Sequence, residues 1–269
     1  MSKSIKLVLS GSGTRYPCFI GAIRALLEEG YEIEELCGTS GGAFIASGFA
    51  SFYNFKNPLA TVDRLESMAM ELLPKPLIDF NFLPFMRKGF IGGRKIFNLL
   101  KKELPESFEG TILPLRVVTF NNSIARHHVW SSDAEGVTLP MCVRASMSLP
   151  VIFDLVNLQG DYHSDGGIVG NFKLDVFGHE ADNVFGIAFS ELEKPKRRKI
   201  LFKRDIIKAH IDGVIETTSL EDIQDMNGTP VCYIKTRHEG LNLKMTKEDV
   251  LDQINDGYIS MKKKLASMT

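Results

Sequence analysis

The chain has 269 residues, which is enough for one large α/β domain or two small ones, and we expect a single domain over residues 1–269. Its 32 Lys and Arg balance 33 Asp and Glu, so the formal net charge of -1 provides no general attraction for nucleic acid. No apolar run reaches the length of a signal-peptide core or a membrane span, and four isolated cysteines (Cys18, Cys37, Cys142 and Cys232) favour reduced thiols in a cytosolic protein over disulfides or a zinc site.

The first elements predict a right-handed βαβ unit. Residues 5–9 form a near-continuous apolar run, which is typical of a parallel strand covered on both faces. Apolar residues then recur at helical spacing from Tyr16 to Leu27, and Gly30 is a stop signal. Residues 33–37 are short and partly apolar, as expected for the end of a second strand.

A glycine-rich turn, Ser10-Gly11-Ser12-Gly13-Thr14, separates the first strand from the helix. Its backbone N–H groups could bind a phosphate or could stabilise the oxyanion of an acyl-transfer intermediate. Pro17 and Cys18 stand where a dinucleotide-binding motif would place its third glycine, and no Gly-Lys-Ser/Thr follows the turn. The nucleotide interpretation is therefore disfavoured.

The second strand leads into Gly38-Thr39-Ser40-Gly41-Gly42, a Gly-x-Ser-x-Gly pattern between a strand and a predicted helix over residues 43–50. Such a strand–turn–helix context is typical of a nucleophile elbow, in which small neighbours let the chain bend sharply and expose the hydroxyl. Glycine and serine also form ordinary turns, so the pattern alone leaves catalysis and a plain turn equally open. We take Ser40 as the candidate nucleophile.

Residues 60–73 predict an amphipathic helix that ends at Pro74. The following segment, residues 77–97, is dense in phenylalanine and interrupted by proline and glycine. It fits a mobile apolar cap able to touch lipid, and it fits equally an irregular loop whose aromatic side chains are buried. Its aromatic residues are Phe80, Phe82, Phe85, Phe90 and Phe97.

Residues 115–120 and 128–130 predict two paired strands, in which the adjacent His127 and His128 point to opposite faces and cannot serve one site. A helix over residues 138–146 follows. The second chemical signal is Asp165-Gly166-Gly167, which we expect at the end of a strand pair. An Asp-Gly turn without a catalytic role is the alternative.

The rest of the chain predicts strands at residues 184–189 and 231–235, a helix at 206–226, and a final helix capped by Thr246. A basic run at residues 194–199 is typical of a solvated loop, and its charge would also suit anionic lipid headgroups.

The chain resembles the patatin-like phospholipases in the order and spacing of three motifs: the glycine turn with its basic residue Arg15, the Ser40 elbow, and the Asp165 motif. Ala145-Ser146 with Pro150 adds a fourth element. The resemblance spans about residues 5–190. It implies a three-layer α/β/α, lysophospholipase-like fold with a mainly parallel sheet, on which residues 200–269 would pack. It also implies a serine acyl hydrolase with a Ser40/Asp165 dyad, without a catalytic metal or a cofactor.

In this resemblance, backbone N–H groups of Gly11, Ser12 and Gly13 form the oxyanion hole. The family often has Asp-Gly-Gly-Gly here and a glycine after the basic residue, whereas this chain has Ser10, Ser12 and Tyr16. We expect this difference to affect rate and substrate fit more than reaction class. Arg15 would hold the turn or a headgroup phosphate, or form a surface ion pair. The supporting residues are Thr14, Arg15, Gly38, Gly41, Gly42, Gly166 and Gly167.

We therefore expect Asp165, made basic by burial, to remove the proton of Ser40 during attack on an ester of a membrane phospholipid. The rival arrangement is a Ser/His/Asp triad, in which His179, His210 or His238 would be the base. None of the three has the strand-then-loop context that this role requires. We expect His163 at the surface or behind the site. A neutral-lipid or thioester hydrolase and a weakly catalytic lipid-binding or scaffold protein stay open. We expect peripheral membrane contact from a cytoplasmic location and no nucleic acid; the sequence does not set the oligomeric state.

Overall fold

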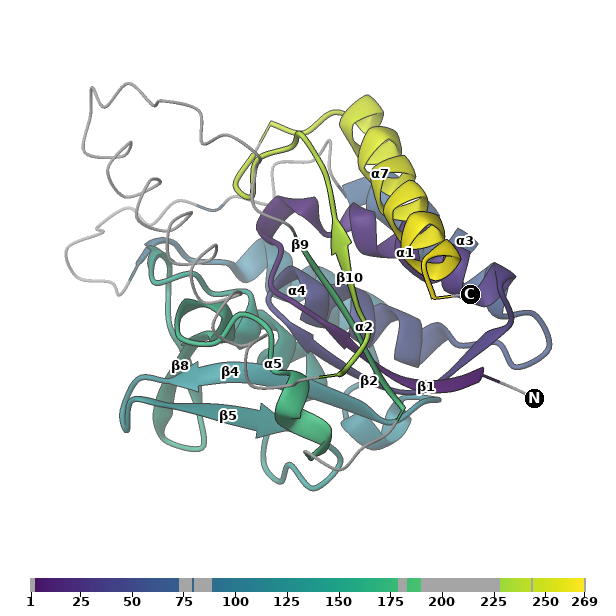
Figure 1. The fold of residues 1–269 in the computed structure, drawn as a ribbon. Coiled ribbons are helices and arrows are strands. Elements are labelled where there is room, and N and C mark those ends of the chain that lie inside the picture. Colours follow the sequence, from purple (N-terminus) through teal and green to yellow (C-terminus); the bar gives the residue numbers. More distant parts are fainter. Residues whose placement is uncertain are drawn as a thin grey trace.

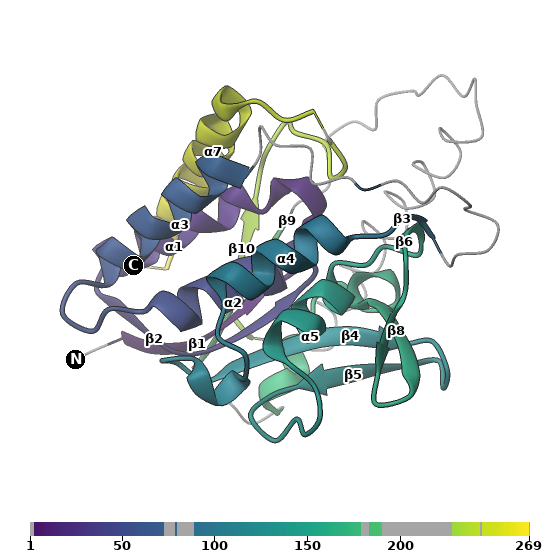
Figure 2. The ribbon, with the colours of Figure 1, turned by 180° about the vertical axis from the view of Figure 1, so that it is seen from behind.

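The computed structural model describes residues 3–72, 79, 89–178, 183–189, 228–242 and 244–268. Its centre is a mostly parallel β-sheet with helices packed against it (Figure 1 and Figure 2). One sheet face carries side chains such as Leu7, Leu36 and Phe185 into the large core formed with the helices. The opposite face packs Val8, Cys37 and Val118 against residues around Phe172 and Leu174. The predicted α/β class with three layers is confirmed.

The N-terminal third has the predicted alternation of strands and helices. Strands β1 and β2 pair in parallel from Lys3↔Tyr31 to Leu9↔Gly38, which confirms the βαβ opening. Pro17 begins the first helix because its missing N–H would be unpaired there in any case. The elements are β1 (Lys3–Leu9), α1 (Pro17–Glu28), β2 (Tyr31–Thr39), α2 (Gly41–Phe52) and α3 (Pro58–Leu72).

The central part adds short elements that the sequence pattern did not predict. The segment over residues 77–97, interpreted from sequence either as a cap or as a loop with buried aromatic side chains, is described only in part. Gly89–Ile91 is a strand and α4 begins at Arg94, whereas Phe80, Phe82 and Phe85 lie outside the described residues, so the cap stays a prediction. The predicted pairing of residues 115–120 with 128–130 is confirmed. The elements are β3 (Gly89–Ile91), α4 (Arg94–Glu103), β4 (Leu115–Asn121), β5 (Arg126–Trp130), α5 (Leu139–Ser146), β6 (Val151–Phe153), β7 (Val156–Leu158) and β8 (Asp161–Asp165).

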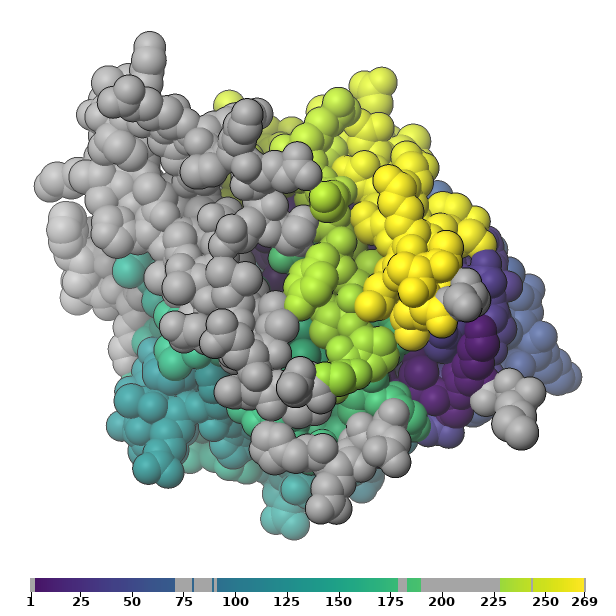
Figure 3. Space-filling view, in the orientation of Figure 1, coloured from purple at the N-terminus to yellow at the C-terminus, as the bar shows by residue number. Residues whose placement is uncertain are grey.

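The C-terminal part completes one edge of the sheet. Strand β9 (Val184–Phe189) pairs with β1, and β10 (Val231–Ile234) pairs with β9, both in parallel. Helix α7 (Lys247–Ala266) lies along α1, so closely that a Cβ on Gly257 would overlap the carbonyl oxygen of Cys18. Figure 3 shows β10 and α7 side by side on one face of the molecule. The basic run at 194–199 and the helix predicted at 206–226 lie outside the described residues.

The strand order is β10-β9-β1-β2-β4-β8-β7, with β5 paired to β4 as well. Among the described residues, no helix is long and apolar enough to cross a membrane. That the whole chain forms one domain stays a prediction.

Candidate active site

Strands β2 and β8 share one edge of β4 and meet end to end. Strand β5 pairs with residues 117–121 of β4 and so occupies the other edge. On the shared edge, β2 runs parallel to β4 and ends with Thr39 opposite Val118, whereas β8 runs antiparallel and ends with Asp165 opposite Thr119. The two carboxyl ends therefore converge on neighbouring positions of β4, which brings Ser40 next to Asp165 although 125 positions separate them in sequence.

The hydroxyl of Ser40 donates a hydrogen bond of 2.6 Å to Oδ2 of Asp165. The other carboxylate oxygen, Oδ1, accepts the N–H of Gly167 at 2.8 Å. Asp165 is only 1% exposed, and this burial raises its pKa to about 7, although the hydrogen bonds from Ser40 and Gly167 act in the opposite direction. A carboxylate with this pKa is an effective general base near neutral pH.

The backbone of Ser40 is held in a strained conformation. Its φ of 54° lies in the left-handed region, which non-glycine residues adopt at an energetic cost that the surrounding structure must offset. Ser146 stabilises it, because Ser146 Oγ accepts the N–H of Ser40 at 2.8 Å and donates to the carbonyl of Val118 at 2.6 Å. The serine of α5 thus bridges the junction between β2 and β4.

Helix α5 and its extension also position the carboxylate. The carbonyl of Ser148 accepts the N–H of Asp165 at 2.9 Å. Ser146 and Ser148 are both fully buried. The sequence pattern had marked Ser146 only as part of a family motif, and it carried no sign of the contact from Ser148, which is made by backbone atoms.

The glycine turn packs on the N-terminus of α2, because a Cβ on Gly41 would overlap Ser12 Oγ, and one on Gly42 would overlap the carbonyl of Ser10. Gly38 is likewise required, since a Cβ there would lie 2.6 Å from Cα of Ala43. These approaches place the turn beside the nucleophile.

One member of the expected oxyanion hole is already engaged. The N–H of Gly11 donates to the carbonyl of Asn171 at 2.9 Å, and Asn171 Nδ2 donates back to the carbonyl of Gly11 at 3.2 Å. The expectation that Gly11 supplies a free donor is therefore corrected: its backbone fixes the turn. In the described part of the chain, the N–H groups of Ser12 and Gly13 have no acceptor.

Two neighbours of the turn have structural contacts. Arg15 is buried, its Nε donates to the carbonyl of Ser12 at 3.4 Å, and its guanidinium lies 4.2 Å from the ring centre of Phe189, so its side chain lies in the interior against the turn, and its role stays a prediction. Thr14 donates its N–H to the carbonyl of Gly240 at 2.8 Å. On the other side of the site, Gly166 begins the 3₁₀ turn that follows Asp165.

Within the described ranges, no histidine forms a hydrogen bond with the side chain of Ser40 or Asp165. His163 is buried rather than exposed, its Nδ1 lies 2.9 Å from Thr119 Oγ1, and burial lowers its pKa to about 4. His127 contacts the carbonyl of Gly166 while His128 stacks on Trp130, consistent with opposite faces. His238 lies beside Asp249, and both His179 and His210 fall outside the described residues.

Comparison with known proteins agrees with this geometry. The family model for patatin-like phospholipase matches residues 7–177. The chain belongs to this family. At the level of the family, membership places it among lipid acyl hydrolases.

Individual relatives of this patatin-like chain differ in how much of their length it spans. It is 23% identical to the uncharacterized protein YqhO of Bacillus subtilis over 290 residues, covering 96% of this chain and 92% of YqhO. It is 29% identical to lysophospholipase nte1 of Aspergillus niger over 199 residues, covering 71% of this chain but 12% of that protein. The crystal structure of VipD from Legionella pneumophila has the same fold, with a TM-score of 0.59 at 19% identity, covering 98% of this chain and 67% of VipD.

Proposed function

We propose that this protein hydrolyses carboxylic esters of phospholipids, as a phospholipase A or lysophospholipase, through an acyl-enzyme on Ser40. The observation that carries the proposal is the direct 2.6 Å hydrogen bond from the Ser40 hydroxyl to the buried carboxylate of Asp165. A serine hydroxyl is a weak nucleophile unless a base accepts its proton, and Asp165 is the base within reach.

In the first half-reaction, Ser40 Oγ attacks the ester carbonyl carbon while Asp165 Oδ2 takes the hydroxyl proton. The carbonyl oxygen becomes an oxyanion, which the N–H groups of Ser12 and Gly13 stabilise. Collapse of this intermediate breaks the bond to the alcohol, and Asp165 returns the proton to the leaving oxygen. The acyl group remains bound to Ser40.

In the second half-reaction, a water molecule attacks the acyl-serine and gives its proton to Asp165. The same N–H groups stabilise the second oxyanion. Its collapse releases the fatty acid, and Asp165 returns the proton to Ser40 Oγ, which restores the dyad.

The choice of phospholipid as substrate rests on the family and on relatives that include a lysophospholipase. We propose that the protein reaches its substrate by peripheral contact with membranes, since lipid esters reside there. Hydrolysis of neutral lipids or thioesters with the same dyad is the second substrate class, and only the assay separates it from the first.

The test is mass spectrometry of lipids incubated with the wild-type chain and with Ser40→Ala. Mixed phospholipids, triacylglycerol and an acyl thioester are offered in parallel. We expect fatty acid and lysophospholipid from the phospholipid mixture, and a loss of at least about a thousandfold in Ser40→Ala because the nucleophile is absent.

Equal product formation by wild type and Ser40→Ala would refute the proposal, and a preference for triacylglycerol or thioester would move it to the second substrate class. Failure of a fluorophosphonate probe to label Ser40, together with no turnover, would favour a lipid-binding or scaffold role.

A further inference from the structure

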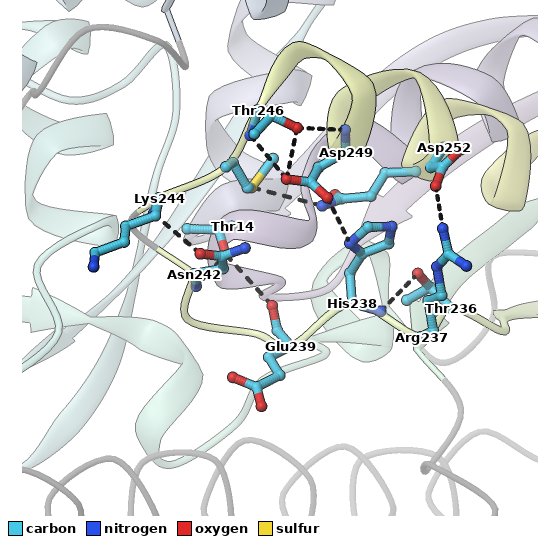
Figure 4. Close-up of polar contacts among 12 residues, drawn as sticks. Thr14, Thr236, Arg237, His238, Glu239, Asn242, Lys244, Thr246, Asp249 and Asp252 are labelled. Atoms are coloured by element: carbon cyan, nitrogen blue, oxygen red, sulfur yellow. Dashed lines mark hydrogen bonds and ion pairs between the residues drawn. The ribbon is translucent and has the colours of Figure 1, made fainter.

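Residues 235–242 and 244–246, between β10 and α7, lie directly on the glycine turn, and we call them the C-terminal loop. Thr14 makes the connection (Figure 4). Its N–H donates to the carbonyl of Gly240 at 2.8 Å, its Oγ1 lies 3.2 Å from the same carbonyl oxygen, and Oγ1 accepts the N–H of Asn242 at 2.8 Å. Residues about 225 positions apart in sequence are thereby joined backbone to backbone at the turn.

The contact is close enough to set the position of the turn. Gly13 has a φ of 56°, and a Cβ on it would overlap the carbonyl oxygen of Gly240. On its other side the turn packs against Gly41, the residue that follows the nucleophile. The peptide groups of Ser12 and Gly13 are thus held between the N-terminus of α2 and the C-terminal loop, so a shift of the loop would move them relative to Ser40.

The loop itself is anchored at its far end. Thr246 caps α7 through a reciprocal pair of hydrogen bonds with Asp249, and His238 Nδ1 lies 3.8 Å from the Asp249 carboxylate. Helix α7 in turn packs along α1, which begins directly after the turn. The C-terminal loop and the glycine turn are therefore both fixed to the same pair of helices.

We propose that the C-terminal loop positions the oxyanion hole, with Thr14, Gly240 and Asn242 as positioning residues that act through the N–H groups of Ser12 and Gly13. This inference rests on the proposed function. The loop lies outside residues 7–177, the range matched by the family model, so the proposal makes the C-terminal segment part of the catalytic apparatus.

The test uses Thr14→Val, which keeps the shape of the side chain but removes the hydroxyl, and Thr14→Ser, which keeps the hydroxyl. Thr111→Val is the matched control, because the hydroxyl of Thr111, like that of Thr14, lies against backbone carbonyl oxygens. Thr111 Oγ1 is 2.7 Å from the carbonyl oxygen of Phe108 and 2.8 Å from that of Leu113, in the connection before β4. Each full-length variant is assayed for kcat and KM with a p-nitrophenyl ester, for inhibition by an aliphatic trifluoromethyl ketone, and for its thermal midpoint.

We expect Thr14→Val to lower kcat by about 10- to 100-fold with KM changed less than about threefold, since complete loss of one oxyanion donor costs about 10²- to 10³-fold. The ketone forms a tetrahedral adduct with the serine, and its inhibition constant should rise by a similar factor. Thr14→Ser should recover most of the rate. Thr111→Val should lower the thermal midpoint while kcat stays near wild type.

Three results would overturn the proposal. Unchanged kcat and ketone inhibition in Thr14→Val would separate the loop from the oxyanion hole. A loss in Thr111→Val as large as that in Thr14→Val would show that general destabilisation is responsible. A wild-type chain that turns the ester over no faster than Ser40→Ala would remove the proposed function itself, and with it this inference; the first two results leave that function standing.

Discussion

Replacement of Asp165 by Asn should inactivate the protein and at the same time stabilise it at neutral pH. The substitution keeps the shape of the side chain and an oxygen for the N–H of Gly167, but it removes the buried charge. An ionised carboxylate that is desolvated destabilises the folded state, and this cost disappears in the amide.

The magnitude follows from the pKa of Asp165, which burial raises from 3.8 to about 7. Between these two values the folded protein binds more protons than the unfolded chain, so the free energy of unfolding falls as the pH rises. At about 1.4 kcal/mol per pH unit, the contribution amounts to about 4 kcal/mol at pH values above 7. Between pH 5 and 8, wild type should therefore lose about 3 kcal/mol relative to Asp165→Asn.

The assay is urea unfolding of both proteins at pH 5, 6, 7 and 8. Asp161→Asn is the matched control, since Asp161 lies on the same strand and its carboxylate accepts a hydrogen bond from Asn121 Nδ2 at 2.8 Å. A pH-dependent difference of the same size in Asp161→Asn would assign the effect to the strand in general, and no such difference in Asp165→Asn would refute the argument from burial.

In the proposed mechanism, the pKa of Asp165 also governs activity. Because only the carboxylate can accept the proton of Ser40, kcat/KM of wild type should be level above about pH 7 and fall tenfold per pH unit below it. A level profile down to pH 5 would mean that Asp165 is ionised throughout, which contradicts a base tuned by burial.

Two further substitutions test the backbone around the dyad. Ser146→Ala leaves the N–H of Ser40 and the carbonyl of Val118 without their partner. It should therefore lower the free energy of unfolding in urea by about 2–4 kcal/mol and lower kcat. Ser47→Ala is the control and should be neutral or stabilising, because Ser47 is buried and its hydroxyl has no partner in the described part of the chain. Val151→Gly should raise the free energy of unfolding by about 1 kcal/mol, because this β-branched residue has a φ of 69°. Val169→Gly is the control and should not stabilise the protein, because Val169 is equally exposed but has a φ of −121°. Equal effects at the two valines would contradict the strain argument.

The elements that local patterns specify could be predicted from the sequence. The strand–turn–helix around Ser40 depends on glycines and apolar runs that lie next to one another, and the cap of α7 depends on Thr246 and Asp249, three positions apart. Helix α4 was not predicted because Gly92 and Gly93 interrupt the pattern just before it begins, and β3, β6 and β7 each have only three residues, too few to show a period.

The assembly of the site depends on contacts that leave no local mark. That Asp165 meets Ser40 follows from the register of two strands on β4, and the sequence identified the pair only through a family resemblance. The engagement of Gly11 by Asn171 joins residues 160 positions apart through one backbone hydrogen bond and one from the Asn171 side chain, and no local pattern around either residue indicates it. The link from Thr14 to Gly240 likewise joins distant residues, through the backbone N–H and the hydroxyl of Thr14.

In the proposed mechanism, the end-to-end meeting of β2 and β8 makes esterase turnover a reporter of the docking of β8 on β4. On that mechanism, a polypeptide still emerging from the ribosome contains Ser40 long before it contains Asp165, and it cannot hydrolyse an ester until β8 has docked on β4. Non-local docking of this kind is slow compared with helix formation, so in refolding experiments recovery of catalysis should lag behind the far-ultraviolet circular dichroism signal.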